Sequence, residues 1–163
     1  MAKVAEWEGI MAILVTGGAG YIGSHTVVEL LSEGYEVIVL DNFSNSSPQA
    51  LENIKKITGK DFKFYEADLL DKPKVEAIFK ENKIDAVIHF AGLKAVGESV
   101  EKPLMYYRNN VVSLVNILEL MPIHKIEGIV FSSSCTVYGQ PEVLPVTESA
   151  PLQKALSPYG NTK

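Results

Sequence analysis

The sequence predicts an α/β fold in which helices cover both faces of a doubly wound parallel sheet. Short apolar runs alternate with longer segments of helical periodicity, and the runs are apolar throughout, as in parallel strands buried on both faces. The first run ends in a glycine-rich turn, Thr16-Gly-Gly-Ala-Gly-Tyr-Ile-Gly23, that leads directly into a helical segment. We therefore expect a Rossmann-like domain over residues 11–163, with strand order 3-2-1-4-5 and a ligand across the carboxyl ends of the strands.

The individual elements follow from this periodicity. The expected strands are the apolar runs at residues 11–16, 36–40, 62–65, 86–90 and 128–131. The expected helices cover residues 21–33, the segment from a polar loop at 44–48 to about residue 57, and residues 73–81 and 103–121. The first helix should bury Ile22, Val27, Leu30 and Leu31 and end at Gly34. Residues 140–157 are rich in proline and are predicted to form a loop.

The composition excludes several classes of protein. The chain has 163 residues, enough for one domain, and its net charge of −5 argues against a nucleic acid or an anionic membrane as partner. The single cysteine, Cys135, excludes an internal disulfide, and no apolar run reaches the roughly 20 residues of a membrane span. The histidines lack metal-ligand spacing. We expect a cytoplasmic protein without a metal, in which residues 1–10 form an N-terminal extension, not a signal peptide.

The glycine-rich turn predicts a phosphate site. A strand that ends at glycines and continues as a helix leaves backbone N–H groups free, and the helix dipole adds partial positive charge there. Gly17, Gly20 and Gly23 have the spacing that makes a tight turn, admits a pyrophosphate and lets the helix pack on the strand. The alternative is a plain strand–helix turn, which would not require the acidic residue found downstream.

That acidic residue favours NAD over NADP. Asp41 ends the second strand, where a carboxylate accepts hydrogen bonds from ribose hydroxyls and repels a 2′-phosphate, and no arginine follows before Ala50. The alternative is an acid that solvates the strand end. Asp68, after the third strand, could reach the adenine or be a solvated turn carboxylate, and Lys94 lies within reach of the nicotinamide ribose.

The last residues, Ser157-Pro-Tyr-Gly-Asn-Thr-Lys163, predict a catalytic pair. Ser157 can cap a helix with Pro158 in its first turn, so that Tyr159 and Lys163 share one face. An ammonium group beside a phenol stabilises the phenolate, which can act as a base. Ser134, beyond the fifth strand, can place a hydroxyl nearby. The alternatives are a coincidental surface pair and an ordinary loop hydroxyl.

These segments together resemble the extended short-chain dehydrogenases and, within them, the UDP-glucose 4-epimerase family. The resemblance covers about residue 11 to the last residue. It rests on the glycine turn, Tyr159-Gly-Asn-Thr-Lys163, Asp41-Asn-Phe-Ser-Asn-Ser46, Phe131-Ser-Ser-Ser-Cys-Thr-Val-Tyr-Gly139 and His89-Phe-Ala-Gly-Leu-Lys-Ala-Val-Gly-Glu-Ser-Val100. 

The resemblance implies a complete set of site residues. The catalytic set would be Ser134, Tyr159 and Lys163, and the substrate would meet Lys94, Ser134 and Tyr159. The residues implied to bind NAD are Gly17, Gly20, Tyr21, Ile22, Gly23, Asp41, Asn42, Phe43, Ser44, Asn45, Ser46, Asp68, Leu69, Phe90, Ala91, Gly92, Leu93, Lys94, Asn109, Tyr159 and Lys163.

The chemistry implied by the resemblance is the interconversion of UDP-galactose and UDP-glucose, a step of galactose metabolism. Tyr159 as phenolate would take the proton of the 4-hydroxyl while hydride leaves C4 for tightly bound NAD. Lys163 would stabilise the phenolate, Ser134 would bind the 4-oxygen, and hydride would return to the opposite face of the 4-keto sugar. The related 4,6-dehydratases carry an Asp-Glu pair after the serine, where this chain has Cys135 and Thr136.

Two other functions stay open at this stage. One is a related epimerase that acts on UDP-N-acetylated sugars, and the other is a non-catalytic dinucleotide-sensing module, which would need no base such as Tyr159. The resemblance further implies a UDP-sugar substrate, a homodimer, and additional sequence after the lysine that forms the last strands and a substrate domain. We therefore expect an incomplete domain that binds NAD weakly, turns over little or not at all, and associates through uncovered surface.

Overall fold

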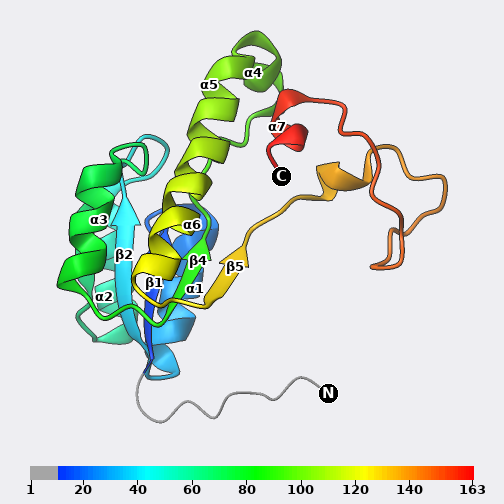
Figure 1. The fold of residues 1–163 in the computed structure, drawn as a ribbon. Helices are drawn as coiled ribbons and strands as arrows, with labels where there is room; N and C mark the ends of the chain where they lie inside the picture. The colour runs from blue at the N-terminus through cyan, green and yellow to red at the C-terminus, as the bar shows by residue number, and fades with distance from the viewer. Residues whose placement is uncertain (1–10) are drawn as a thin grey trace, which may run out of the picture.

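Five parallel strands form one sheet in the order β3-β2-β1-β4-β5 in the computed structural model, which describes residues 11–163 (Figure 1). The strands are β1 (Ala12–Thr16), β2 (Glu36–Asp41), β3 (Lys63–Glu66), β4 (Ala86–His89) and β5 (Gly128–Phe131). The predicted fold class and strand order are confirmed. The predicted extension at residues 1–10 lies outside the described residues.

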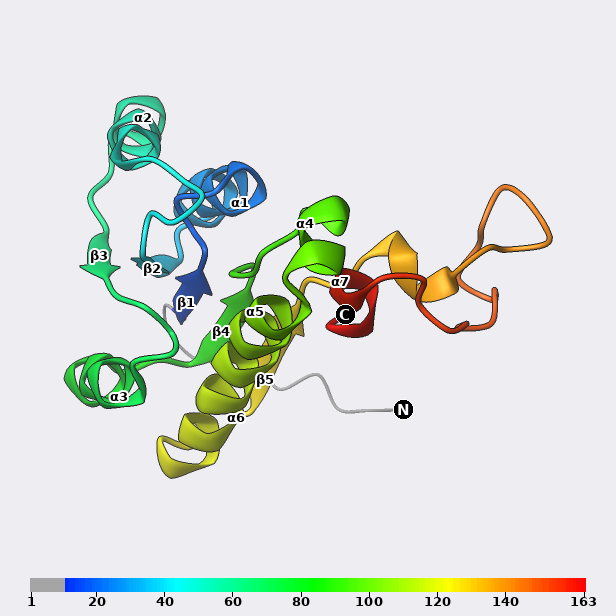
Figure 2. The same ribbon diagram turned by 90° about the horizontal axis from the view of Figure 1, so that it is seen from above.

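Two apolar cores form because strand side chains alternate between the faces of the sheet. On one face, Ile13 and Val15 pack with residues of α1 (Tyr21–Ser32) and α2 (Pro48–Thr58). On the other face, Leu14 packs with residues of α3 (Lys72–Glu81) and α6 (Ser113–Ile123). Figure 2 shows these two helix pairs on opposite sides of the sheet. Because both faces are covered, the ends of the strands are left to form the ligand site.

The segment expected as one helix over residues 103–121 is divided. It consists of α5 (Pro103–Tyr107), a π-helical turn η1 (Arg108–Val112) and α6. A further short helix, α4 (Val96–Glu101), precedes it in a segment whose sequence has no apolar helical stripe. Pro103 begins α5 because proline fits the first turn of a helix. It also ends α4, because it has no N–H group with which to continue the helical hydrogen bonds.

The chain after β5 carries little regular structure. A 3₁₀ turn, η2 (Cys135–Tyr138), follows the serines, and the predicted loop at residues 140–157 leads to α7 (Pro158–Asn161). Within the described part of the chain, no helix combines the length and apolarity needed to cross a bilayer.

One predicted core residue is wrong. Ile22 is 59% exposed, whereas Val27 and Leu31 of the same helix are buried. Ile22 and Tyr21, in the first turn of α1, line the ligand cleft and are not packed against the sheet.

Candidate active site

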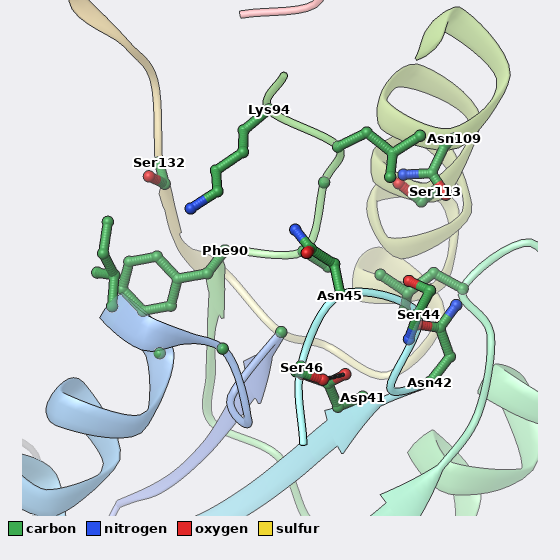
Figure 3. A pocket seen from close by; sticks show the side chains of 18 of the residues that line it. Asp41, Asn42, Ser44, Asn45, Ser46, Phe90, Lys94, Asn109, Ser113 and Ser132 are labelled. Carbon is green, nitrogen blue, oxygen red and sulfur yellow. Dashed lines mark hydrogen bonds between the residues drawn. The ribbon is translucent and has the colours of Figure 1, made fainter. Parts of the chain in front are cut away.

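A cleft of about 400 Å³ lies at the carboxyl ends of the strands, where a doubly wound sheet binds its ligand. In Figure 3, polar residues from Asp41 to Ser46 gather beyond β2, and Lys94, Phe90 and Ser132 lie at the other end of the view. The predicted site residues that line the cleft are Gly17, Gly20, Tyr21, Ile22, Gly23, Asp41, Asn42, Ser44, Asn45, Ser46, Asp68, Leu69, Phe90, Ala91, Gly92, Leu93, Lys94, Asn109, Ser134, Tyr159 and Lys163. The cleft is also lined by residues that the sequence did not single out, namely Leu40, Ala67, Ser113, Ser132 and Ser133.

The glycine turn has no room for side chains. Gly17 has φ +69°, and a Cβ on it would lie 2.7 Å from the amide nitrogen of Ala91. A Cβ on Gly23 would collide with the carbonyl oxygen of Gly17. Gly20 caps α1 without any side-chain hydrogen bond, and the first turn carries no acidic residue. The N–H groups at this helix end are therefore left for an anion, as a diphosphate site requires.

Asp41 joins two loops of the cleft and is only 8% exposed. Its carboxylate accepts hydrogen bonds from the Ala19 amide at 3.0 Å, the Phe43 amide at 2.9 Å and the Ser46 hydroxyl at 2.7 Å. A carboxylate offers about four lone-pair sites, so one site, on Oδ2, stays available to a ligand hydroxyl. Its charge is thereby fixed beside the glycine turn.

Asp68 is tied to the same loop. It accepts hydrogen bonds from the Asn42 side-chain amide at 3.2 Å and from the Leu70 backbone amide at 2.8 Å. The two loops that follow β2 and β3 are thus connected at this end of the cleft.

Phe43 is the one predicted site residue that does not line the cleft. It has φ +56°, and its ring packs beside Phe64 with the centroids 5.2 Å apart. The ring is partly buried against the core on the α1–α2 side of the sheet. The ring thus packs against the core, while the polar residues on either side of Phe43 line the cleft.

Sequence reasoning missed Asn110, which is 3% exposed. Its side chain accepts from the Leu93 amide at 2.8 Å and donates to the Leu93 carbonyl and the Thr162 hydroxyl, each at 2.9 Å. Asn109 lines the cleft and donates to Asn110 at 3.0 Å. Both lie in the π-turn η1, and such turns occur frequently at functional sites. Asn110 thus connects the loop after β4 with α7.

The end of the chain brings Tyr159 and Lys163 into the cleft with Ser134. The Ser157 hydroxyl accepts from the Gly160 amide at 3.1 Å and Pro158 begins α7, as the sequence predicts. The Ser134 hydroxyl accepts from the Thr136 amide at 3.3 Å. These bonds place a phenol, an ammonium group and a hydroxyl along one cleft.

The Lys163 ammonium group is held by two neighbours. It donates to the Ser132 carbonyl at 2.9 Å and lies 4.9 Å from the centroid of the Phe131 ring. Burial lowers the pKa of Lys163 because it disfavours the charged form. The Ser132 carbonyl and the Phe131 ring together fix the position of the ammonium group at the wall of the cleft.

His89 is a core residue. It is fully buried, its Nδ1 lies 2.8 Å from the Thr16 hydroxyl, and its ring stacks on Phe131 at 6.0 Å. Burial, together with the charge of Lys163, lowers the pKa of His89 to about 4. Among residues 11–163, no three His, Cys, Asp or Glu side chains are grouped so that they could hold a metal ion.

Comparisons with known proteins agree with this geometry. The sequence model of the family described as GDP-mannose 4,6 dehydratase matches residues 14–163. UDP-glucose 4-epimerase of Bacillus subtilis (strain 168) is 64% identical over 153 residues, which are 94% of this chain and 45% of that protein. UDP-glucose 4-epimerase 2 of Arabidopsis thaliana is 56% identical over 155 residues, which are 93% of this chain and 44% of that protein.

Solved structures give the same result. The structure of UDP-glucose 4-epimerase from Bifidobacterium longum in complex with NAD+ and UDP matches with a TM-score of 0.92 and 54% identity, covering 94% of this chain and 46% of that one. The enzyme from Brucella ovis in complex with NAD matches with a TM-score of 0.83 and 39% identity, covering 93% and 44%. The chain thus spans less than half the length of these relatives.

Proposed function

We propose that this chain, which belongs to the family described as GDP-mannose 4,6 dehydratase, forms the NAD-binding part of a UDP-glucose 4-epimerase. The reaction is the interconversion of UDP-galactose and UDP-glucose through transient oxidation at C4 of the sugar. The observation that carries the proposal is a single cleft shared by the glycine turn, Asp41, and the set Ser134, Tyr159 and Lys163. The epimerases to which the chain is 64% and 54% identical support it.

The residues of the cleft fit NAD. The N-terminus of α1, which has no side-chain cap, suits a diphosphate. Gly17 lies so close to the backbone of Ala91 that a side chain at position 17 would not fit. Asp41 suits the diol of the adenosine ribose. The volume of about 400 Å³ lies within the usual range of cofactor sites. When bound, NAD supplies an acceptor for the hydride of sugar C4.

The chain's own residues handle the proton. We assign Tyr159 as the base that takes the proton of the sugar 4-hydroxyl, since it is the phenol in the cleft nearest in sequence to a fixed cation. Lys163, held by Ser132, stabilises the phenolate by its charge. The Ser134 hydroxyl is assigned to the 4-oxygen of the sugar.

The chemistry of the neighbouring residues favours epimerisation over dehydration. A 4,6-dehydration also needs an acid and a base near C5 and C6 of the sugar. The residues after Ser134 are Cys135 and Thr136, which offer no carboxyl group. We therefore assign an epimerase activity within a family that is described by a dehydratase.

The arrangement of the whole enzyme is part of the proposal. Residues 11–163 form the cofactor-binding part, and a substrate domain for the UDP-sugar lies in the portion of the relatives that this chain does not match. We propose a cytoplasmic homodimer as the complete enzyme, with the fragment itself turning over little or not at all.

Isothermal calorimetry of this chain with NAD and NADP tests the cofactor assignment. We expect NAD to bind at least about tenfold more tightly, and Asp41→Asn to weaken NAD binding by about tenfold or more, because a hydrogen bond to a charged group is lost. Asp61→Asn removes the same charge at a side chain that is 92% exposed and should change neither affinity. No measurable NAD binding would contradict the proposal.

Turnover of UDP-galactose by the complete enzyme tests the chemistry. We expect Tyr159→Phe to keep NAD binding and to lose turnover, since the phenol oxygen carries the proton. If turnover persists, the base assignment is wrong, and if the unchanged enzyme binds NAD without turnover, a dinucleotide-sensing module is the better description.

A further inference from the structure

The short loop that carries Lys94 is bound by two buried polar side chains, Tyr106 of α5 and Asn110 of η1. Lys94 and Ala95 are exposed, and the loop connects β4 with α4. Nevertheless, the backbone groups on both sides of Lys94 have side-chain partners: Asn110 binds the amide and the carbonyl of Leu93, and the Tyr106 hydroxyl binds the amide of Ala95. These bonds fix the backbone on either side of an exposed residue that lines the cleft.

Tyr106 makes the anchor at Ala95. The residue is fully buried, and its hydroxyl accepts from the Ala95 amide at 3.0 Å and donates to a Glu98 carboxylate oxygen at 3.0 Å. The other oxygen of Glu98 accepts from Lys102 at 3.2 Å. A buried tyrosine hydroxyl requires partners, and here one partner is the backbone next to a residue of the cleft.

The geometry also gives the end of the cleft at which Lys94 acts. Asp41 marks the adenosine end, since it follows β2 and suits the ribose diol. Lys94 belongs to the loop after β4 and shares the cleft with Ser132, Tyr159 and Lys163. On the proposed function, this second end holds the nicotinamide ribose.

We infer that Tyr106 is a positioning residue for Lys94: its hydroxyl fixes the backbone at Ala95 and thereby holds the Lys94 ammonium group at the nicotinamide end of the cleft. The inference rests on the proposed function for the identity of the ligand. Tyr106 and Asn110 lie four residues apart on α5 and η1, so one helix segment fixes the loop on both sides of Lys94.

Binding of NAD and of AMP to Tyr106→Phe tests the inference. AMP fills only the adenosine end, so its affinity should stay within about twofold, whereas the Kd of NAD should rise about five- to tenfold through loss of one hydrogen bond. Tyr107→Phe makes the same change at the neighbouring residue, whose hydroxyl has no hydrogen-bond partner among residues 11–163 and whose side chain is exposed, and should alter neither affinity. Equal weakening of AMP and NAD, or unchanged NAD binding in Tyr106→Phe, would overturn the inference.

A double substitution separates positioning from general stability. Lys94→Ala should weaken NAD binding, and adding Tyr106→Phe to it should cause little further loss, because the hydroxyl acts through the lysine. Multiplied effects in the double variant would show that the two residues act independently and would refute the role.

Hydrogen exchange of the unchanged, ligand-free chain gives a test that needs neither folding of a variant nor NAD binding. The Ala95 amide should exchange about tenfold or more slowly than the exposed amides of residues 140–157, because its donor is held by a buried hydroxyl. Fast exchange of Ala95 would overturn the inference. Absence of NAD binding together with a slow Ala95 amide would contradict the proposed function while leaving the anchor in place.

Discussion

His89 shows how a buried neutral side chain links the glycine turn to the catalytic end of the cleft. Its Nδ1 lies 2.8 Å from the hydroxyl of Thr16, the last residue of β1, and its other face stacks on Phe131. The Phe131 ring in turn faces the Lys163 ammonium group at 4.9 Å. Protonation of His89 would therefore put a positive charge at a buried site close to the Lys163 ammonium group.

This arrangement predicts a loss of stability in mild acid. The pKa of His89 falls from 6.5 to about 4 on folding, so between these values the unfolded chain binds a proton that the folded chain does not. Stability is then fully present above pH 6.5 and is lost as the pH falls towards 4, by about 2 kcal/mol between pH 7 and pH 5. Urea unfolding at a series of pH values measures the slope.

Substitution of the histidine identifies the source of that slope. His89→Gln should lower stability at pH 7, because the buried site is disturbed, but should remove most of the dependence between pH 7 and pH 5. His25→Asn, at an exposed histidine, should keep the dependence of the unchanged chain. An undiminished slope in His89→Gln would assign the pH dependence to other groups.

At the scale of elements, α7 depends on its surroundings for its structure. It is only four residues long, far below the length at which an isolated helix is stable. The Ser157 cap fixes its first turn, and the Thr162 hydroxyl donates to the Tyr159 carbonyl at 2.7 Å while it accepts from Asn110. Because Tyr159 lies on α7 and Lys163 follows its last residue by two positions, the cap also helps to fix the proposed catalytic pair.

Removal of the cap should loosen α7 more than the rest of the fold. We expect Ser157→Ala to cost about 1 kcal/mol locally and to speed hydrogen exchange of the Gly160 amide about fivefold, since that amide loses its acceptor. Ser149→Ala, in the loop at residues 140–157, removes a hydroxyl whose one side-chain partner among the described residues is Thr147, and is the matched control. Similar exchange at Gly160 in both variants would show that the cap does not hold the turn.

The elements that could be predicted from sequence are those with local signals. The strands are apolar runs, and the glycine turn is defined by residues that follow one another, so their order and position are confirmed. The short helix α4 was not predicted, because it buries only Ser99 and presents no apolar stripe. The π-turn was not predicted either, because the segment has the spacing of a regular helix. In the π-turn Asn109 lines the cleft, and Asn110 next to it binds the backbone of Leu93.

Ile22 was misplaced, and the ring of Phe43 packs away from the cleft, for reasons that lie outside their own segments. Ile22 fits the apolar stripe of α1, but it lines the cleft and is 59% exposed. Phe43 lies in a polar run that faces the cleft, but its ring finds apolar partners around Phe64. Asn110 could have been noted as a polar residue at a core-facing position, although its partners Leu93 and Thr162 are distant in sequence and only the fold reveals them.

At the scale of the molecule, the covered faces of the sheet contrast with its β5 edge. Each face is buried under two helices, but within residues 11–163 β5 pairs only with β4, and Val130 at its centre is 61% exposed. A strand edge with unpaired backbone groups and an exposed β-branched side chain is a template for pairing with another chain. Nearby, Val115 and Leu118 of α6 are also more than 40% exposed.

We therefore predict that residues 11–163 associate in solution through the β5 edge. Sedimentation velocity should show an average mass that rises with concentration, and Val130→Lys should shift this rise to roughly tenfold higher concentration, because a charged side chain on an edge strand opposes pairing. Val143→Lys places the same charge at a residue that is 76% exposed in the loop after η2, and it should behave as the unchanged chain. A monomer at all concentrations would contradict the prediction, and a loss of association in both variants would move the contact from the sheet edge to that loop.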